Sequence, residues 1–415
     1  MTATADALDQ ATDPLDGLKI IDCDSHWTEP PDLWTARVPA TMRSKVPVME
    51  THDGYTAWYL DGQLWAGTGG NTIERGNQKI LGAHMIHPFD EIDASAWDVE
   101  ARLGLLDLMG VYAQVLYPNA IGFSSNHIVA IEDLAQREMV AEVYNDYLME
   151  VQQASGERLF PQAMLPIWDM DLCVREIARM AEKGARGFTL TDKPTRVGLP
   201  ELDEPYFAPM WEALDAIHGV VNFHIGSGGR RAEDSETKAD RHERLNRSPV
   251  AGRTEEYWDS FGLQRRLAVF ATQMYMSNVR IVVNLCMSDL FDRYPHVKVV
   301  SAESGIGWVP FVLEAMEYQL DQMVTHEEEM IQQRRPTEYF RDHIYVMFWF
   351  EKSAPKRLVE DIGVRNIFVE TDVPHPTCLY PGAREHFAEV LGDLDEPTRR
   401  RILQDNAAEA YKIPV

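Results

Sequence analysis

Short apolar runs alternate along the chain with longer amphipathic stretches. The apolar runs have the length of strands and lie at 18–24, 112–117, 159–165, 186–191, 219–224, 297–303, 344–350 and 366–372. The amphipathic stretches predict helices at 129–154, 170–183, 204–217, 308–325 and 354–361. Strands that alternate with helices predict a parallel sheet, because parallel strands need long crossover connections. Eight such strands predict an α/β fold, a closed (β/α)8 barrel of the TIM type.

Two long segments interrupt this alternation. Residues 27–95 follow the first strand and are rich in Trp, Gly, Thr and Pro, and residues 226–260 follow the fifth strand and are charged and glycine-rich. Both could be solvent-facing excursions, but loops at the carboxyl ends of barrel strands build the active site. We therefore interpret them as insertions that form a lid or a substrate wall. Residues 1–17 are expected to be a disordered lead-in, and residues 18–415 a single barrel domain.

Composition and charge narrow the class of protein. The 415 residues carry 39 Lys+Arg against 66 Asp+Glu, a net charge of −27, with 45% hydrophobic and 25% charged residues. This composition is typical of a soluble globular protein, and the acidity disfavours nucleic-acid and anionic-membrane partners. No apolar run approaches the roughly 20 residues of a membrane helix, and the N-terminus lacks the features of a signal peptide, so we expect a cytoplasmic protein. The four cysteines are widely scattered, which argues against a zinc-ribbon or redox motif.

Acids and histidines stand where the predicted strands end. The first strand ends in Asp24 and His26, which are two apart and therefore share one face, while Cys23 is expected to point into the barrel wall. The corresponding residues of three later strands are His224 in NFHIG, Glu303 in SAESG and Asp372 in ETDVPHP. Each alone has an ordinary structural explanation. Together at one end of a barrel they predict a metal centre for Zn, Mn or Fe, with one or two ions per chain.

Four further residues are weaker candidates. Glu29 and His375 follow predicted ligands closely, and could orient those ligands or simply cap loops. Glu351 follows the seventh strand, where substrate contact and surface charge are equally plausible. Trp308 comes after the ESGIG turn and could line a pocket or only pack.

Several motifs carry a resemblance over nearly the whole chain. They are IDCDSHWTEPPDLW, LPIWDMDLCVREIARMAEKGARGFTLT, NFHIG, YPHVKVVSAESGIGWVP, NIFVETDVPHP and ILQDNAAEAYKI. With these the chain resembles the amidohydrolase superfamily, in particular the branch of amidohydrolase-related proteins and nonoxidative decarboxylases such as aminocarboxymuconate semialdehyde decarboxylase. The resemblance implies a divalent metal held by Asp24, His26, His224 and Asp372, and commonly a homodimer.

The sequence departs from the family pattern at two positions. The first-strand pair is Asp-x-His rather than His-x-His, and Glu303 stands where the family has a histidine that activates metal-bound water. A buried carboxylate there could act as a general base or bind a second metal. We therefore expect a metal-dependent hydrolase or nonoxidative decarboxylase of a small organic substrate, with Asp372 and Glu303 as catalytic groups. The alternative is a dinuclear iron or manganese oxygenase in which Glu303 is a metal ligand.

Overall fold

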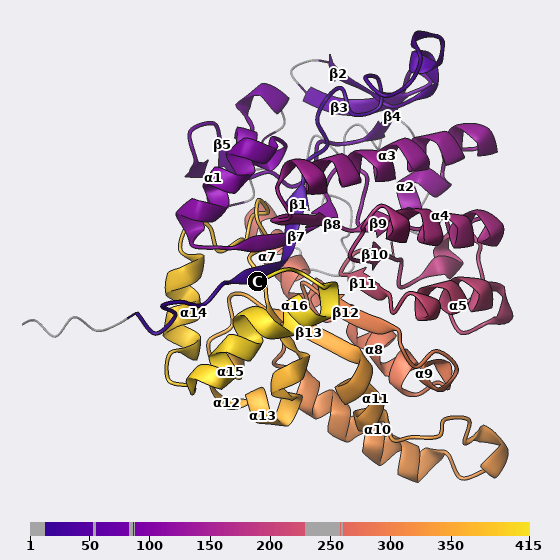
Figure 1. Ribbon diagram of the computed structural model, residues 1–415, viewed down its shortest axis with the longest axis vertical. Helices are drawn as coiled ribbons and strands as arrows, with labels where there is room; N and C mark the ends of the chain where they lie inside the picture. Colours follow the sequence, from indigo (N-terminus) through magenta and orange to yellow (C-terminus); the bar gives the residue numbers. More distant parts are fainter. Residues whose placement is uncertain (1–12, 53–54, 83–85, 87, 229–257, 259) are drawn as a thin grey trace, which may run out of the picture.

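The structure is a computed structural model that describes residues 13–52, 55–82, 86, 88–228, 258 and 260–415. Most of the predicted insertion at 226–260 therefore lies outside the described residues. The remaining chain forms a central sheet surrounded by helices, as the ribbon diagram shows (Figure 1).

The central sheet contains nine parallel strands among the described residues. In the order in which they pair they are β8 (Leu159–Pro161), β7 (Ala113–Pro118), β1 (Ile21–Trp27), β14 (Ile367–Val369), β13 (Ile344–Phe348), β12 (Lys298–Ala302), β11 (Val220–His224), β10 (Phe188–Thr189) and β9 (Ala163–Met164). The two ends of this order, β8 and β9, are separated in the chain only by Gln162. They are the two halves of the predicted third strand, so the sheet curls almost completely into the predicted barrel.

A register irregularity in β1 changes which side chains enter the barrel. Its pairing with β7 shifts between Asp22 and Ser25, which is the signature of a bulge. Cys23 lies in the apolar cluster that fills the barrel interior, together with Ile21. The prediction that Cys23 points into the outer wall is therefore wrong. Because of the extra residue in the bulge, Asp24 and His26 also point into the barrel, nearer to its carboxyl end than Cys23.

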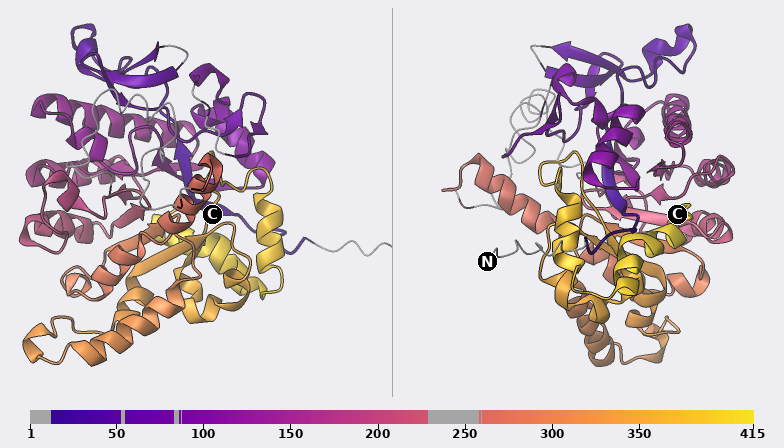
Figure 2. Two further views of the ribbon diagram at one scale, coloured as in Figure 1. Left: turned by 180° about the vertical axis from the view of Figure 1, so that it is seen from behind. Right: turned by 60° about the vertical axis from the view of Figure 1, so that its left-hand side comes forward.

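Helices cover the outside of the sheet (Figures 1 and 2). The α-helices of the described residues are α1 (Val99–Met109), α2 (Asn126–Val129), α3 (Leu134–Ala154), α4 (Met170–Glu182), α5 (Ala208–Ala216), α7 (Leu263–Met274), α8 (Val279–Cys286), α9 (Leu290–Arg293), α10 (Val309–Met323), α11 (Pro336–His343), α12 (Ala354–Arg357), α13 (Val359–Ile362), α14 (Ala383–Leu391), α15 (Glu396–Arg400) and α16 (Asn406–Tyr411). The five predicted helical stretches correspond to α3, α4, α5, α10 and the pair α12–α13. No helix in the described part of the chain has the length and apolar character needed to cross a membrane.

The last helix closes one end of the barrel. Ala407, Ala408 and Tyr411 of α16 belong to the same apolar cluster as the inward side chains of the strands. The Tyr411 hydroxyl donates a hydrogen bond of 2.6 Å to Asn222 Oδ1 inside the barrel. Lys412 contacts the carbonyl of Ile217, just before β11, so this plug lies at the amino-terminal end of the strands. The carboxyl-terminal end is left for the candidate site.

The first insertion, residues 27–95, forms small sheets of its own. An antiparallel sheet contains β2 (Val48–His52), β3 (Tyr55–Leu60) and β4 (Gln63–Ala66), and a hairpin contains β5 (Ile73–Glu74) and β6 (Gln78–Lys79). The larger sheet lies beyond α3 at the top of Figure 1. The residues between β4 and β6 contact the loop after β14: Thr72 donates to the carbonyl of Pro374 from both its backbone and its hydroxyl. The insertion is therefore anchored to the strand end that carries Asp372.

Residues 13–17 of the predicted lead-in are packed against the barrel. Leu15 is completely buried, and Asp13 forms an ion pair with Arg384 of α14. Residues 1–12 lie outside the described part of the chain. Where the sequence predicts a disordered segment up to residue 17, order thus begins by residue 13.

Candidate metal centre

The five residues predicted at the strand ends meet in the structure. Asp24 and His26 lie on β1 and His224 ends β11, whereas Glu303 follows β12 directly and Asp372 comes three residues after β14. All five are buried. Glu303 and Asp372 have left-handed backbones, with φ of 54° and 60°, which non-glycine residues rarely adopt. Such strain concentrates at functional sites, where the surrounding structure must hold it.

His26 and His224 stand at the centre of the cluster. His26 Nε2 lies 3.6 Å from Asp24 Oδ1 and 3.5 Å from Asp372 Oδ1. His224 Nε2 lies 3.3 Å from Asp24 Oδ2 and 3.4 Å from Glu303 Oε2, and the two Nε2 atoms are 3.2 Å apart. Imidazole and carboxylate groups therefore converge on one small volume.

The outer nitrogen of each imidazole faces a backbone carbonyl. His26 Nδ1 lies 3.2 Å from Pro118 O, and His224 Nδ1 lies 2.7 Å from Ile225 O. Because a carbonyl only accepts, each Nδ1 carries the proton and each Nε2 turns a lone pair inward. This is the arrangement by which proteins orient histidine ligands of metals.

Three carboxylate oxygens of the cluster lack hydrogen-bond donors. Both oxygens of Asp24 and Oδ1 of Asp372 are buried and accept no hydrogen bond. Buried, unpaired carboxylate oxygens are costly, and a cation removes that cost. Asp24, His26, His224 and Glu303 offer ligand atoms within 4.8 Å of one another, as do His26, Glu303, Asp372 and His375. The residues present thus fit a divalent cation.

The protein surroundings shift the proton affinities of the cluster in opposite directions. Burial, with the charges of Asp372 and Asp24, raises the pKa of Glu303 well above its ordinary value. Burial, with the nearby His375, lowers the pKa of His26 to about 4. Burial opposes the charge of Asp372 too, but contacts with His375 and His26 outweigh it and lower the pKa of that carboxyl group. Two carboxyl groups in one site with such divergent pKa values can serve as acid and base.

Glu29 and His375 occupy places next to the cluster. His375 Nδ1 lies 2.8 Å from Asp372 Oδ1, and its ring stacks on that of His26 with centroids 3.7 Å apart. Glu29 faces away from the cluster and accepts backbone N–H groups of Asn119 and Ala120, at 3.3 and 2.8 Å. Asn119 in turn contacts His375, so Glu29 supports the cluster only through that loop.

Glu351 and Trp308 support the turn after β12. Glu351 accepts the backbone N–H groups of Ile306 and Gly307, at 2.9 and 2.8 Å. Trp308 is nearly buried and donates its indole N–H to the carbonyl of Ser304, at 3.0 Å. Both side chains therefore fix the backbone of the loop that begins with Glu303.

Three residues near the cluster were not recognised in the sequence. Arg102 of α1 is completely buried and donates to the carbonyl of His26, at 2.8 Å. Phe123 places its ring 4.0 Å from that of His224. Glu370 is completely buried and accepts the backbone N–H of Glu303, at 3.0 Å. Glu370 could have been found, because the predicted strand 366–372 puts it two residues before Asp372 on the same face, whereas Arg102 and Phe123 carry no local signal.

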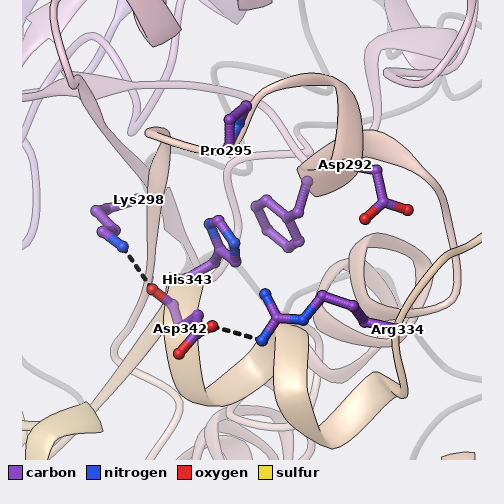
Figure 3. A pocket seen from close by; sticks show the side chains of 7 residues that line it. Asp292, Pro295, Lys298, Arg334, Asp342 and His343 are labelled. Atoms are coloured by element: carbon purple, nitrogen blue, oxygen red, sulfur yellow. Dashed lines mark hydrogen bonds and ion pairs between the residues drawn. The ribbon is translucent and has the colours of Figure 1, made fainter.

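A separate pocket lies at the opposite end of the strands. It has a volume of about 350 Å³ and is lined by residues that include Lys298, Arg334, Asp342 and His343 (Figure 3). Lys298 begins β12 and His343 directly precedes β13, so the pocket lies at the amino-terminal ends of these strands. Asp342 pairs with Arg334, and its carbonyl accepts from Lys298. The polar side chains are thus largely occupied with one another.

Comparison with known proteins agrees with this geometry. A family model described as Amidohydrolase matches residues 21–413. Gamma-resorcylate decarboxylase of Polaromonas sp. (strain JS666 / ATCC BAA-500) is 24% identical over an alignment of 322 residues, with 76% of this chain and 87% of that protein covered.

Two solved structures share the fold. An amidohydrolase from Mycobacterium avium subsp. paratuberculosis K-10 has a TM-score of 0.68 at 17% identity, covering 96% of this chain and 99% of the other. A dihydroxybenzoic acid decarboxylase from Polaromonas sp. JS666, with bound manganese and the inhibitor 2-nitroresorcinol, has a TM-score of 0.58 at 18% identity, covering 95% and 97%. The family match spans nearly the whole chain and confirms the resemblance seen in the sequence. The chain is an enzyme of the amidohydrolase family.

Proposed function

We propose that the enzyme is a metal-dependent nonoxidative decarboxylase of a hydroxylated aromatic carboxylate. The observation that carries the proposal is the buried cluster at the carboxyl end of the barrel, whose unpaired carboxylate oxygens and inward imidazole lone pairs fit a divalent cation. Asp24, His26, His224 and Asp372 are the proposed ligands. When bound, the cation supplies positive charge that attracts the oxygens of an anionic substrate.

The protein's own groups then manage one proton. Decarboxylation breaks the bond between a ring carbon and the carboxylate, CO2 leaves, and the electron pair on the carbon takes up a proton. Asp372 and Glu303 are the proposed carriers of that proton, because they lie in one buried site and their pKa values are displaced in opposite directions. Both carboxyl groups are buried, so bulk water is excluded from this step.

Aromatic side chains beside the cluster favour a flat substrate. Phe123 lies next to the rings of His224 and His26, with centroids 4.0 and 4.9 Å away. Tyr275, which follows α7, makes an edge contact with Trp349 at 5.0 Å, and its hydroxyl lies 3.4 Å from that of Thr377. The ring of an aromatic substrate would pack favourably against such aromatic side chains. The relatives named above as decarboxylases act, by their names, on resorcylate and dihydroxybenzoic acid.

The other two activities predicted from the sequence have weaker support. Hydrolysis uses the same cation and the same acid–base pair, and it differs in releasing no CO2. None of the relatives named above is described as an oxygenase, so oxygenation has no support from them. The single domain over 18–415, the homodimer and the cytoplasmic location stay predictions.

The test is release of labelled CO2 by the metal-loaded enzyme. Protein equilibrated with Mn²⁺ is incubated with 2,6-dihydroxybenzoate and related hydroxybenzoates labelled with ¹³C in the carboxyl group. We expect labelled bicarbonate from at least one of them, and its loss in Asp372→Asn. The exposed Asp203→Asn is the matched control and keeps full activity. Hydrolysis of amides or esters without any labelled bicarbonate would overturn the proposal in favour of a hydrolase.

A further inference from the structure

Trp349 has a buried indole N–H group without an acceptor. The residue directly follows β13, and its side chain is completely buried. No described residue accepts a hydrogen bond from its Nε1 atom. A buried donor without a partner costs free energy, so a partner from outside the chain would stabilise it. Trp58 and Trp97 also lack an acceptor, but Trp349 differs from them in standing at the end of a barrel strand.

The alternation of side chains along β13 turns Trp349 toward the inside of the barrel. Met347 belongs to the apolar cluster that fills the barrel interior, whereas Val346 and Phe348 belong to the larger cluster between the sheet and the helices. Because alternate residues of a strand share a face, Trp349 lies on the face of Met347, one step nearer the carboxyl end. That is the end of the barrel that carries the candidate metal centre.

Tyr275 lies over the same end of the barrel, because Asn278 anchors the segment that follows α7. Asn278 is buried and donates its side-chain amide to the carbonyls of Phe223 and Ala302, at 2.7 and 3.1 Å. These two carbonyls are among the last residues of β11 and β12. Tyr275 comes three residues before Asn278 and is half-buried. It therefore stands beside the strand ends that carry the site.

The Tyr275 hydroxyl has only a long contact with its acceptor. It lies 3.4 Å from Thr377 Oγ1, whereas hydrogen bonds between hydroxyl oxygens usually measure about 2.7–2.8 Å. The Thr377 hydroxyl donates its own proton to Asp372 Oδ2, at 3.2 Å, so Tyr275 is the donor in the longer contact. An acceptor at a normal distance would bind the Tyr275 hydroxyl more strongly than Thr377 does.

Two poorly paired donors thus belong to neighbouring aromatic side chains. The rings of Tyr275 and Trp349 meet edge to face, with centroids 5.0 Å apart. Phe350 extends this group, with its ring 4.6 Å from Trp349 and 5.6 Å from Tyr275. Aromatic rings that also offer an O–H and an N–H donor fit an aromatic ligand that brings an oxygen acceptor.

We propose that Tyr275 and Trp349 bind a second oxygen substituent on the ring of the substrate. The carboxylate and the hydroxyl group next to it lie at the metal centre, and the two donors bind a hydroxyl or methoxyl oxygen elsewhere on the ring. The substrate is then a benzoate with at least two oxygen substituents. This inference rests on the proposed function for the class of substrate, and it makes Tyr275 and Trp349 specificity-determining residues.

The test measures binding of analogues that cannot lose CO2, because a nitro group replaces the carboxylate. The reference is 2-nitrophenol, which has one hydroxyl group. Four diols, 3-nitrocatechol, 4-nitroresorcinol, 2-nitrohydroquinone and 2-nitroresorcinol, add a second hydroxyl at each remaining ring position. Full-length protein loaded with Mn²⁺ is titrated with each compound in a calorimeter. We expect the wild type to bind one diol about tenfold or more tightly than 2-nitrophenol.

Two variants remove one donor each and keep an aromatic ring. Tyr275→Phe and Trp349→Phe should each reduce the preference for that diol by at least about threefold, while 2-nitrophenol still binds. Differences in acidity among the analogues cancel, because the preference is compared between proteins. The exposed Tyr318→Phe is the matched control and should keep the full preference. In wild-type protein labelled with ¹⁵N at tryptophan, the indole signal that Trp349→Phe lacks should shift on binding of the diol.

The outcomes separate this inference from the proposed function. A wild type that binds no diol more tightly than 2-nitrophenol would overturn the inference. An equal preference in the wild type and both folded variants would overturn it too. Release of labelled CO2 from a benzoate, without any preference among the nitro analogues, would refute only the inference. A preference that both variants reduce, without release of CO2 from any benzoate, would refute only the proposed function.

Discussion

Glu29 should make the stability of the protein depend on pH near neutrality. This carboxyl group is completely buried, and burial raises its pKa from 4.5 to about 7, although N–H groups of Ala120 and other residues partly oppose the shift. The folded protein therefore keeps the proton in a range where the unfolded chain has lost it. Stability is full below pH 4.5, falls as the pH rises to about 7, and is level above that. The shift corresponds to about 3 kcal/mol.

The variant Glu29→Gln isolates this effect, because its side chain cannot ionise. Thermal unfolding of the wild type and the variant is followed by circular dichroism from about pH 4.5 to 8, a range set by the two pKa values. We expect the wild type to lose on the order of 5 °C relative to the variant over that range. The exposed Glu212→Gln should run parallel to the wild type. A constant difference between wild type and Glu29→Gln would refute the assignment of a protonated Glu29.

Three further predictions concern the groups around the cluster. Arg102→Ala leaves buried acceptors unpaired, including the carbonyl of His26. We expect it to lower the free energy of unfolding in urea by at least about 3 kcal/mol and to weaken Mn²⁺ binding in calorimetry. The exposed Arg400→Ala should have neither effect. Glu351→Ala leaves two backbone N–H groups without an acceptor in the loop that begins with Glu303. We expect kcat to fall about tenfold or more with little change of KM, because the position of Glu303 becomes less well defined. An unchanged kcat would contradict this prediction. Chelation should lower the thermal midpoint and added Mn²⁺ restore it, because the buried carboxylates lose their counter-charge; equal midpoints would contradict a buried metal centre.

The strand ends were predictable from the sequence because each carries a local signal. Asp24 and Asp372 each follow an apolar run, and parallel strands deliver their carboxyl ends to one side of a barrel. The distances of 3.2–3.6 Å around His26 and His224 show how closely these separate strand ends converge. The same logic failed for Cys23, because a bulge between Asp22 and Ser25 shifts the alternation of β1, and the sequence pattern did not indicate it.

Residues that reach the cluster from helices and loops could not be predicted. Arg102 lies on α1, the helix that follows the first insertion, and its role depends on the position of a carbonyl on another element. Asn119 matters only because the insertion brings Gly70 and Thr28 to its amide. His375 was recognised as a neighbour of Asp372, but its ring also contacts Asn119 and Gly70, which lie about 250 and 300 residues away in the chain. Contacts between such distant segments depend on the tertiary structure and produce no periodic pattern in the sequence.

The position of bound metal tests the account most directly. Crystals of the protein equilibrated with Mn²⁺ are measured at the manganese absorption edge, so that anomalous scattering locates the ions. The account predicts a peak at the carboxyl end of the barrel, about 2.0–2.3 Å from side-chain atoms of Asp24, His26 and His224. A fully loaded protein with no anomalous peak among these residues would contradict it.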